Sequence, residues 1–329
     1  MRAPGFWDDG GPLAWLLAPA GALVGGLTAW RTGRPGAKAT VPVVCVGNFT
    51  AGGAGKTPTA IAVAELLRQA GRRPVFLSRG YGGAVREPVQ VDPALHRAAQ
   101  VGDEPLLLAR HGPAVVSPDR VAGAALAATL GDVIVMDDGL QNPSLAKDLR
   151  LAVVDGAAGI GNGLCVPAGP LRAPLAAQLR RVDAVVLIGT GAAGADVAAR
   201  AVAAGVPVLK GSLVPDPAAA ARLAGRTVLA FAGIGRPGKV FASLEALGAT
   251  IGARHAFADH HAFTRAELAD LLDRAARGGM VPVTTEKDRV RLEGMLSPAQ
   301  AAVLETLPVR LELDAPEALA GLLRPLRRS

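Results

Sequence analysis

Apolar residues along this chain fall into two alternating kinds of segment. Short runs of Val, Ile and Leu without polar alternation predict strands that are buried on both faces, and Ala- and Leu-rich stretches between them predict helices. The strands are expected at residues 41–46, 74–78, 114–117, 132–136, 151–155 and 184–188, and the helices at 58–70, 104–110, 119–130 and 193–204. This alternation is typical of the α/β class, in which helices cover both faces of a parallel sheet.

A proline-rich stretch at residues 213–217 interrupts this alternation. Because such a break is typical of a domain boundary, we predict a second, smaller α/β domain after it. Its strands are expected at residues 227–231, 253–258, 281–284 and 309–313, and its helices near 238–247 and 264–277. The predicted organisation is an N-terminal segment at 1–40, a larger domain at 41–212, a linker at 213–226 and the second domain at 227–329.

The N-terminal segment contains an uncharged run at residues 11–30, which is just long enough to span a bilayer. Prolines and glycines inside the run disfavour a regular span, whereas Trp15 and Trp30 suit a membrane interface. Two aspartates precede the run, where a signal peptide would carry positive charge. Three interpretations stay open: a helix lying in the interface, a single span, and a helix packed on the protein. Basic residues that suit anionic lipid follow directly, namely Arg31, Arg34 and Lys38.

The most informative motif lies between the first predicted strand and the first predicted helix. It reads Gly-Asn-Phe-Thr-Ala-Gly-Gly-Ala-Gly-Lys-Thr-Pro at residues 47–58. Strand, glycine loop, Lys-Thr and helix are the layout of a phosphate-binding loop, in which backbone N–H groups and the helix N-terminus face phosphate oxygens. Lys56 would reach the terminal phosphates and the Thr57 hydroxyl would ligate Mg²⁺. The usual pattern has Gly where Thr50 stands, and the alternative is a glycine-rich turn that only caps a helix.

Composition narrows the classes of function. The chain has 329 residues and half of them are apolar, which predicts a globular protein rather than a disordered one. Its net charge of +7 suits phosphorylated substrates, an anionic membrane surface or nucleic acid. Nucleic acid is the weakest of these, because the basic residues are dispersed and aromatic residues make up only 3%. Cys45 and Cys165 provide neither a disulfide framework nor a zinc site, and they favour a reducing compartment.

Carboxylates follow one of the predicted strands and open one of the predicted helices. The strand at 132–136 leads into Asp137 and Asp138, at the sheet edge where the phosphate loop also lies, so these two are placed to hold Mg²⁺ or its waters. An Asp-Gly turn is the alternative. Asp103 opens a predicted helix, where capping would by itself explain an aspartate.

Other charged and aromatic residues gather where strands end. Arg79 and Tyr81 lie in a glycine-rich loop that either binds phosphate or sugar or merely turns, and Arg120 follows the next strand. His260 and His261 end a strand of the second domain, and adjacent histidines lie more often in a surface turn than in a metal site. A Thr-Thr-Glu-Lys-Asp run occupies another strand-to-helix junction, where capping is the plain interpretation.

Taken together, the motifs resemble those of one family. Their order along the chain is the phosphate loop, Ser-Arg-Gly-Tyr-Gly-Gly, Gly-Asp-Glu-Pro, Ser-Pro-Asp-Arg, Asp-Asp-Gly-Leu-Gln, Gly-Asn-Gly, Pro-Ala-Gly-Pro-Leu-Arg, Phe-Ala-Gly-Ile-Gly, Asp-His-His-Ala-Phe and Thr-Thr-Glu-Lys-Asp. The series covers roughly residues 40–292 and resembles tetraacyldisaccharide 4'-kinase, the lipid A kinase of Gram-negative bacteria. A single motif of this kind is weak, whereas the ordered set is highly specific.

The resemblance implies both a fold and a function. The fold would be a parallel sheet like that of P-loop nucleoside triphosphate hydrolases, with a second domain that closes on the nucleotide. The function would be transfer of the ATP γ-phosphate, with Mg²⁺, to the 4'-hydroxyl of an acylated glucosamine disaccharide lipid. The N-terminal helix would associate with the cytoplasmic face of the bacterial inner membrane. Neither nucleic acid nor a protein partner is implied.

The resemblance also implies roles for individual residues. Asp103 matches the family's catalytic base, and His260 matches the histidine that hydrogen-bonds and orients that base. Arg172 would neutralise developing phosphoryl charge alongside Lys56. The triphosphate would be wrapped by Thr50, Ala51, Gly52, Gly53, Ala54, Gly55, Lys56 and Thr57. The metal would be held by Thr57, Asp137 and Asp138. Candidates for binding the lipid substrate are Arg79, Tyr81, Arg120 and His261.

Two departures from the family pattern limit this transfer of roles. Ala173 stands where the family commonly has Glu, and Asn142 stands where it often has His.

Two other classes of protein also stay open. A P-loop GTPase or metallochaperone would need a guanine-reading Asn-Lys-x-Asp, which the sequence lacks. A membrane-recruited ATPase acting on protein partners would carry the same loop, and phosphoryl transfer to a lipid acceptor separates it from a kinase.

Overall fold

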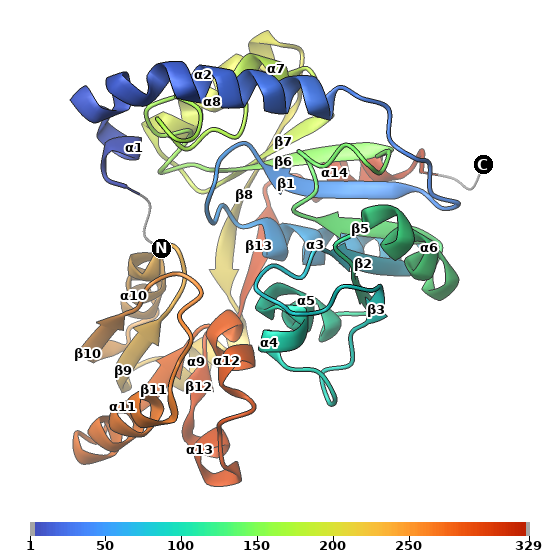
Figure 1. The fold of residues 1–329 in the computed structure, drawn as a ribbon. Helices are drawn as coiled ribbons and strands as arrows, with labels where there is room; N and C mark the ends of the chain where they lie inside the picture. Colours follow the sequence, from blue (N-terminus) through green and yellow to red (C-terminus); the bar gives the residue numbers. More distant parts are fainter. Residues whose placement is uncertain (1–3, 327–329) are drawn as a thin grey trace.

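The computed structural model describes residues 4–326, and its largest element is a nine-stranded sheet (Figure 1). Its two edge pairs are antiparallel and the remaining neighbours run parallel, which confirms the predicted α/β class. Across the sheet the strands are β13 (Val309–Leu313), β8 (Val208–Pro215), β7 (Ala184–Ile188), β6 (Leu149–Asp155), β1 (Val43–Asn48), β5 (Val133–Asp137), β2 (Pro74–Ser78), β4 (Ala114–Val116) and β3 (Val89–Gln90).

Helices cover both faces of this sheet, as the continuous apolar strands require. One face packs against α3 (Lys56–Gln69), α5 (Asp103–Ala109) and α14 (Pro316–Leu323). The other face packs against α6 (Arg120–Leu130), α7 (Leu175–Leu179) and α8 (Ala192–Ala203). A single turn, α4 (Ala98–Val101), precedes α5. The carboxyl ends of β1 and β5 therefore meet at one edge of the sheet, where the loops after them lie together.

A four-stranded parallel sheet forms the core of the second domain. Its strands are, in spatial order, β10 (Thr250–Ala256), β9 (Thr227–Ala232), β11 (Val281–Thr284) and β12 (Glu305–Thr306). Its helices are α9 (Pro217–Leu223), α10 (Pro237–Ala246), α11 (Arg265–Arg277), α12 (Glu286–Leu292) and α13 (Pro298–Val303). In Figure 1 this domain lies below the carboxyl edge of the large sheet, with α12 beside α5.

The structure corrects the predicted linker and the predicted end of the second domain. β13 pairs antiparallel with β8, and α14 packs against the large sheet, so the last described residues return to the first domain. Leu213 still belongs to β8, and Leu223 of α9 is buried in the second domain, so residues 213–226 form no free linker. Periodicity locates a strand but does not say which sheet it joins. Residues 1–3 and 327–329 of the predicted terminal segments lie outside the described residues.

The N-terminal segment forms α1 (Phe6–Asp9) and α2 (Pro12–Thr32), which lies along the first domain (Figure 1). By length and composition α2 is able to cross a membrane. It also packs on the protein through small residues: a Cβ added at Gly21 would lie 2.5 Å from the Cys165 carbonyl oxygen, and one at Gly25 would lie 2.5 Å from the Cys165 sulfur. Its large apolar side chains point to solvent instead, namely Leu13, Trp15, Leu16, Leu23, Val24, Leu27 and Trp30.

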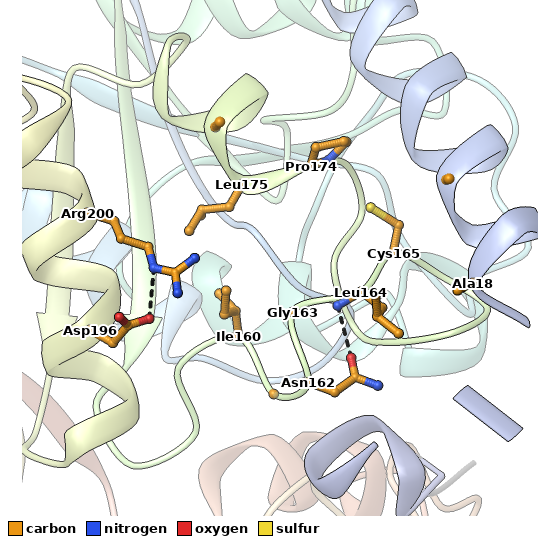
Figure 2. A pocket seen from close by; sticks show the side chains of 13 residues that line it. Ala18, Ile160, Asn162, Gly163, Leu164, Cys165, Pro174, Leu175, Asp196 and Arg200 are labelled. Atoms are coloured by element: carbon orange, nitrogen blue, oxygen red, sulfur yellow. Dashed lines mark hydrogen bonds and ion pairs between the residues drawn. The ribbon is translucent and has the colours of Figure 1, made fainter. Parts of the chain in front are cut away.

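A cavity of about 630 Å³ lies beside α2, and none of the residues that line it belongs to the phosphate loop (Figure 2). Ala18 of α2, Ile160, Cys165 and Leu175 line it with apolar surface, and the Asp196–Arg200 ion pair of α8 lies at one side. The helix therefore rests on the body of the protein along only part of its length.

Candidate active site

The phosphate loop joins β1 to α3 at the carboxyl edge of the large sheet. Gly52 and Gly55 have φ angles of 124° and 92°, in the region that only glycine adopts easily, so the backbone can turn tightly here. Lys56 begins α3, and its ammonium donates to the Gly52 carbonyl oxygen at 3.2 Å. The Asn48 amide donates to the same oxygen at 2.9 Å. The lysine ammonium thus folds back over the loop, beside the N-terminus of the helix, as phosphate binding requires.

The segment before α7 braces the first part of this loop. The Ala51 N–H donates to the Pro170 carbonyl oxygen at 2.8 Å, and the Arg172 side chain donates to the Thr50 carbonyl oxygen at 3.1 Å. Thr50 forms an isolated antiparallel bridge with Leu171. A β-branched residue suits this extended conformation, which explains why the loop tolerates Thr where its pattern usually has Gly.

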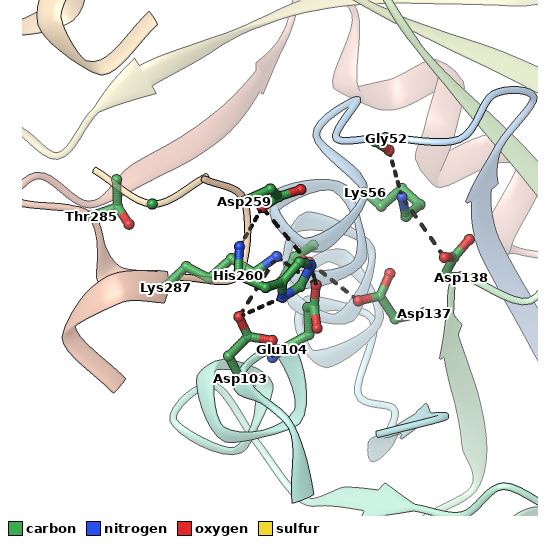
Figure 3. Close-up of polar contacts among 12 residues, drawn as sticks. Gly52, Lys56, Asp103, Glu104, Asp137, Asp138, Asp259, His260, Thr285 and Lys287 are labelled. Carbon is green, nitrogen blue, oxygen red and sulfur yellow. Dashed lines mark hydrogen bonds and ion pairs between the residues drawn. The ribbon is translucent and has the colours of Figure 1, made fainter. Parts of the chain in front are cut away.

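Asp137 and Asp138, at the end of β5, face this loop as predicted (Figure 3). Asp137 accepts a hydrogen bond from the Thr57 hydroxyl at 3.2 Å, and Asp138 lies 3.1 Å from Arg172 and 3.9 Å from the Lys56 ammonium. Burial, with the neighbouring Asp138 charge, raises the pKa of Asp137 to about 6 against the pull of Lys56. Burial would also raise the pKa of Asp138, but Lys56 and Arg172 outweigh it and hold that pKa below its ordinary value.

The two aspartates fit a divalent cation. Oδ1 of Asp137 and Oδ1 of Asp138 are buried and have no hydrogen-bond partner among the described residues. An unpartnered buried carboxylate oxygen is costly, and a hard cation with oxygen ligands relieves that cost. The Thr57 hydroxyl, 3.2 Å from the other oxygen of Asp137, completes a donor set of the kind that Mg²⁺ prefers.

A second group of charged residues is assembled from both domains. Asp103 begins α5 of the first domain and is buried, and its Oδ2 lies 3.1 Å from Nδ1 of His260, which follows β10 of the second domain. Arg291 of α12 donates to the same oxygen through Nε at 2.7 Å and also through a terminal nitrogen. Glu104 accepts from the Lys287 ammonium at 2.6 Å. The predicted pairing of Asp103 with His260 is therefore present, with two cations that we had not predicted.

These contacts drive the pKa values of two adjacent carboxyl groups apart. Burial alone would raise the pKa of Asp103, but the hydrogen bond with His260 and the charges of Lys287 and Arg291 outweigh it and hold that pKa well below its usual range. Burial raises the pKa of Glu104 to about 7, with the charge of Asp103 adding to the effect against that of Lys287. Asp103 is consequently ionised at neutral pH, whereas Glu104 titrates there.

Asp103, Glu104 and His260 also have the spacing of a metal site, because they offer ligand atoms within 4.8 Å of one another. Lys287 and Arg291 already pair with the two carboxylates, however, and their charges disfavour a further cation. These residues therefore fit a cation less well than the sheet edge with Asp137 does.

The four candidate lipid-binding residues lie in different environments. Arg79 is exposed after β2, and Tyr81 is 67% exposed with its ring edge-on to His260 at a centroid distance of 5.4 Å. Arg120 is buried and donates to the Ser117 carbonyl oxygen at 2.6 Å. His261 stacks on Phe257 and lies 3.1 Å from Glu267 of α11, so the structure does not bring it to Asp103.

The sequence offered a reason to expect a role for Lys287 and Arg291, but the run that contains Lys287 was interpreted only as a helix cap. Thr285 does cap α12, since its side chain accepts from the Asp288 N–H, as the plain interpretation of the Thr-Thr-Glu-Lys-Asp run expected. Residues 287 and 291 are four apart on this helix and so share one face. A pair of cations on one face of a strand-end helix would have pointed to an acidic partner in the other domain.

The chain is similar to known proteins over nearly its full length. The family model described as Tetraacyldisaccharide-1-P 4'-kinase, LpxK, matches residues 13–327. A protein of Methylobacterium nodulans named tetraacyldisaccharide 4'-kinase is 61% identical over 97% of this chain and 94% of its own length. One of a Bradyrhizobium species with the same name is 53% identical over 98% of this chain and 94% of its own. A crystal structure of LpxK from Aquifex aeolicus, an "apo" form in complex with ATP, has a TM-score of 0.73 at 27% identity, covering 96% of this chain and 99% of that one.

Proposed function

The chain belongs to the tetraacyldisaccharide-1-phosphate 4'-kinase family, and on that premise we propose how its residues carry out the reaction. It is a lipid kinase of lipid A biosynthesis, and the resemblance inferred from its motifs is confirmed. Its substrates are ATP and a tetraacyldisaccharide 1-phosphate, whose 4'-hydroxyl receives the γ-phosphate. The observation that supports our assignment of the residues is the contact of Asp103 with His260 at 3.1 Å, which joins the two domains beside a phosphate loop.

We assign the two ends of the phosphoryl transfer to different groups. Asp103 accepts the proton of the 4'-hydroxyl, and His260 fixes its orientation. Lys56 and the N–H groups of residues 50–57 bind the triphosphate, while Arg172 compensates charge on the transferred group. Positioning and charge supply most of the catalysis in reactions of this kind. Two cationic side chains already directed at Asp138 support this assignment, since they hold positive charge at the loop.

We further propose that Thr57, Asp137 and Asp138 hold Mg²⁺, which when bound neutralises charge on the phosphates. The unpartnered carboxylate oxygens described above support this site. Thermal melting tests it without turnover. Mg²⁺ should raise the melting temperature of the wild-type chain and not that of Asp137→Asn. An equal rise in both proteins would contradict the site.

We propose that the chain lies on the cytoplasmic face of the bacterial inner membrane, with α2 in the interface. The side chains of Trp15, Leu16 and Leu23 are 71–77% exposed, whereas Gly21 and Gly25 seat the helix on the protein. A long apolar face of this kind suits the boundary between head groups and acyl chains. The Arg34 guanidinium lies 4.0 Å from the Trp30 ring, at the end where basic residues would meet anionic lipid.

The lipid substrate would then reach Asp103 from that surface. Tyr81 is exposed beside His260, Arg79 is exposed in the same loop, and the two suit binding of the sugar and phosphate groups of the lipid. Arg120 is buried and donates to the Ser117 carbonyl oxygen, so we give it the role of supporting the turn after β4 rather than of direct binding. His261 is omitted from this set because of its contacts with Phe257 and Glu267.

Incubation of the purified full chain with γ-labelled ATP and tetraacyldisaccharide 1-phosphate in mixed micelles tests the function. We expect a labelled lipid whose new phosphate is at the 4' position. Hydrolysis of ATP without label in the lipid would contradict the function and favour the ATPase alternative.

Flotation with anionic vesicles tests the membrane surface. Leu16→Glu together with Leu23→Glu should release the chain from vesicles and raise the apparent KM for vesicle-borne lipid, while ATP binding is retained. Glu substitution of Val303, which is exposed in the second domain, is the matched control. Flotation of the double variant at the wild-type level would place the membrane contact elsewhere.

A further inference from the structure

Three charged residues join the two domains at a second place beside the phosphate loop. Asp155 ends β6, the strand next to β1, and its side chain is only 7% exposed. Its Oδ2 accepts from Arg236 at 3.0 Å and from Lys239 at 2.5 Å. Both cations belong to the second domain, where Arg236 is the N-cap residue of α10 and Lys239 lies in its first turn. The phosphoryl transfer proposed above uses none of the three.

The cluster lies close to the phosphate-binding backbone. Gly235 immediately precedes Arg236, and a Cβ added at Gly235 would lie 3.8 Å from the backbone nitrogen of Gly53. Gly53 is one of the residues whose N–H groups are proposed to bind phosphate. Arg236 thus follows a residue of the second domain that lies close to the loop.

The charges of the cluster do not balance. One carboxylate, Asp155, faces two cations and the positive end of α10, whose N-cap residue makes no side-chain capping bond. The side chains of Arg236 and Lys239 remain 40% and 49% exposed, so both are accessible. A guanidinium has five N–H donors and an ammonium has three, and the contacts with Asp155 use few of them. Surplus positive charge and unused donors beside a phosphate loop suit a polyanionic ligand.

We propose that Arg236 and Lys239 bind phosphate oxygens of the nucleoside triphosphate, and that Asp155 competes with the nucleotide for them. This inference rests on the proposed function, since it requires a triphosphate at the loop. The second domain thereby contributes directly to nucleotide affinity, and does so only when it lies against the loop.

The alternative is that these ion pairs only hold the two domains together, and it makes a different prediction for Asp155. In that case loss of the carboxylate and loss of either cation should weaken the contact between the domains, and ATP binding with it, to the same extent. If the cations bind phosphate, loss of the carboxylate frees them and removes a repelling negative charge beside the phosphates.

Calorimetric titration of the full chain with ATP and with ADP distinguishes the two accounts. Arg236→Gln and Lys239→Met should each raise the Kd for ATP by about 10-fold or more, the usual effect of losing a hydrogen bond between charged groups. The effect on ADP should be smaller. Asp155→Asn should lower the Kd for ATP. Arg254→Gln is the matched control, because that exposed arginine pairs with Glu245 inside the second domain, and its Kd should equal that of wild type.

Two results would overturn the proposal. One is a wild-type Kd for ATP in both Arg236→Gln and Lys239→Met; the other is an Asp155→Asn chain that binds ATP as weakly as they do, which would show that the ion pairs only hold the two domains together. Melting temperatures verify folding, and Lys239→Met carries the test if Arg236→Gln fails to fold. Failure of the kinase function is recognised separately, because a wild-type chain that binds ATP but phosphorylates no lipid leaves these Kd values measurable.

Discussion

Two carboxylate pairs, Asp137–Asp138 and Asp103–Glu104, are built in different ways within one proposed site. The first pair ends a strand, and all its partners come from the first domain: Lys56 and Thr57 from the loop beside it and Arg172 from a segment that braces the loop. The second pair lies at a helix start in the first domain but takes its partners, Lys287, Arg291 and His260, from the second.

In each pair one carboxyl is held ionised while burial raises the pKa of its neighbour, to about 6 for Asp137 and to about 7 for Glu104. The difference is what supplies the opposing charge. The charge around Asp138 is fixed by one rigid sheet edge, whereas that around Asp103 depends on the position of the second domain. Domain movement should therefore change the basicity of Asp103 and leave the first pair almost unaltered.

Each carboxylate pair has one residue with a strained backbone, either in the pair or among its partners. Within residues 4–326, the non-glycine residues with positive φ are Asp138 at 54° and His260 at 57°. Strained conformations of this kind persist where the surrounding structure imposes them, commonly at functional sites. One strained residue at each carboxylate pair supports the view that the two pairs form a single site.

The largest expected effect is that of removing Lys56, the cation beside the Asp137–Asp138 pair. Lys56→Ala should reduce kcat by about a thousandfold or more, because charge stabilisation at the phosphates supplies most of the rate. Steady-state phosphorylation of the lipid measures it. Arg68→Ala, on the exposed face of the same helix, is the control and should keep wild-type turnover. Near-normal turnover of folded Lys56→Ala would remove the loop from the mechanism.

Substitution of Asp103 or His260 should reduce kcat by a smaller factor, and the two losses should not be independent. Asp103→Asn and His260→Ala should each reduce kcat by about 10²- to 10⁴-fold with little change in ATP affinity, since both act on the acceptor hydroxyl. The double variant should be much less impaired than the product of the two losses, because residues that act as a unit are not additive. Fully multiplicative losses would show that the two side chains act independently.

Loss of Arg291 should change the pH dependence rather than abolish turnover. Without that charge the pKa of Asp103 rises, so protonation inactivates the base at a higher pH. In Arg291→Met the acid limb of the kcat profile should therefore lie at higher pH than in the wild type. Arg110→Met is the matched control, because it removes another ion pair between the domains, with Glu293. An identical shift in the control would assign the effect to domain contact alone.

The smallest expected effect is on the free energy of unfolding, and it should have opposite signs for substitutions of Asp137 and of Asp103. The pKa of Asp137 is raised from 3.8 to about 6 in the folded state, so stability is lost as pH rises through that range. Asp137→Asn should therefore gain about 1–3 kcal/mol at pH 8 without divalent metal, and nothing at pH 3. The pKa of Asp103 is lowered, so its contribution is present above its unfolded value and is lost only at lower pH.

Asp103→Asn should consequently destabilise the chain at pH 8, where it removes one of the two carboxylates that pair with the buried Arg291. Thermal melts of both variants at pH 8 and pH 3 provide the measurement. If both substitutions change the melting temperature in the same direction at pH 8, the two pairs do not differ as described.

Sequence alone determined the parts of this protein that depend on short-range order. The phosphate loop, the strand that ends in Asp137, and the helix after Lys56 follow from glycine conformation, apolar runs and helix propensity, all of which act within a few residues. The uncharged run that forms α2 could be recognised in the same way, and so could the family, because its motifs are local and ordered.

Tertiary structure decided everything that depends on which segments meet. Only the folded chain shows that β13 and α14 return to the first sheet, that Arg291 and Lys287 reach Asp103 and Glu104, and that His261 does not. It also decides that Gly21 and Gly25 seat α2 while its larger side chains face outward. The physical reason is range: propensity and periodicity are properties of neighbouring residues, whereas an ion pair over 188 positions is fixed by the packing of two domains.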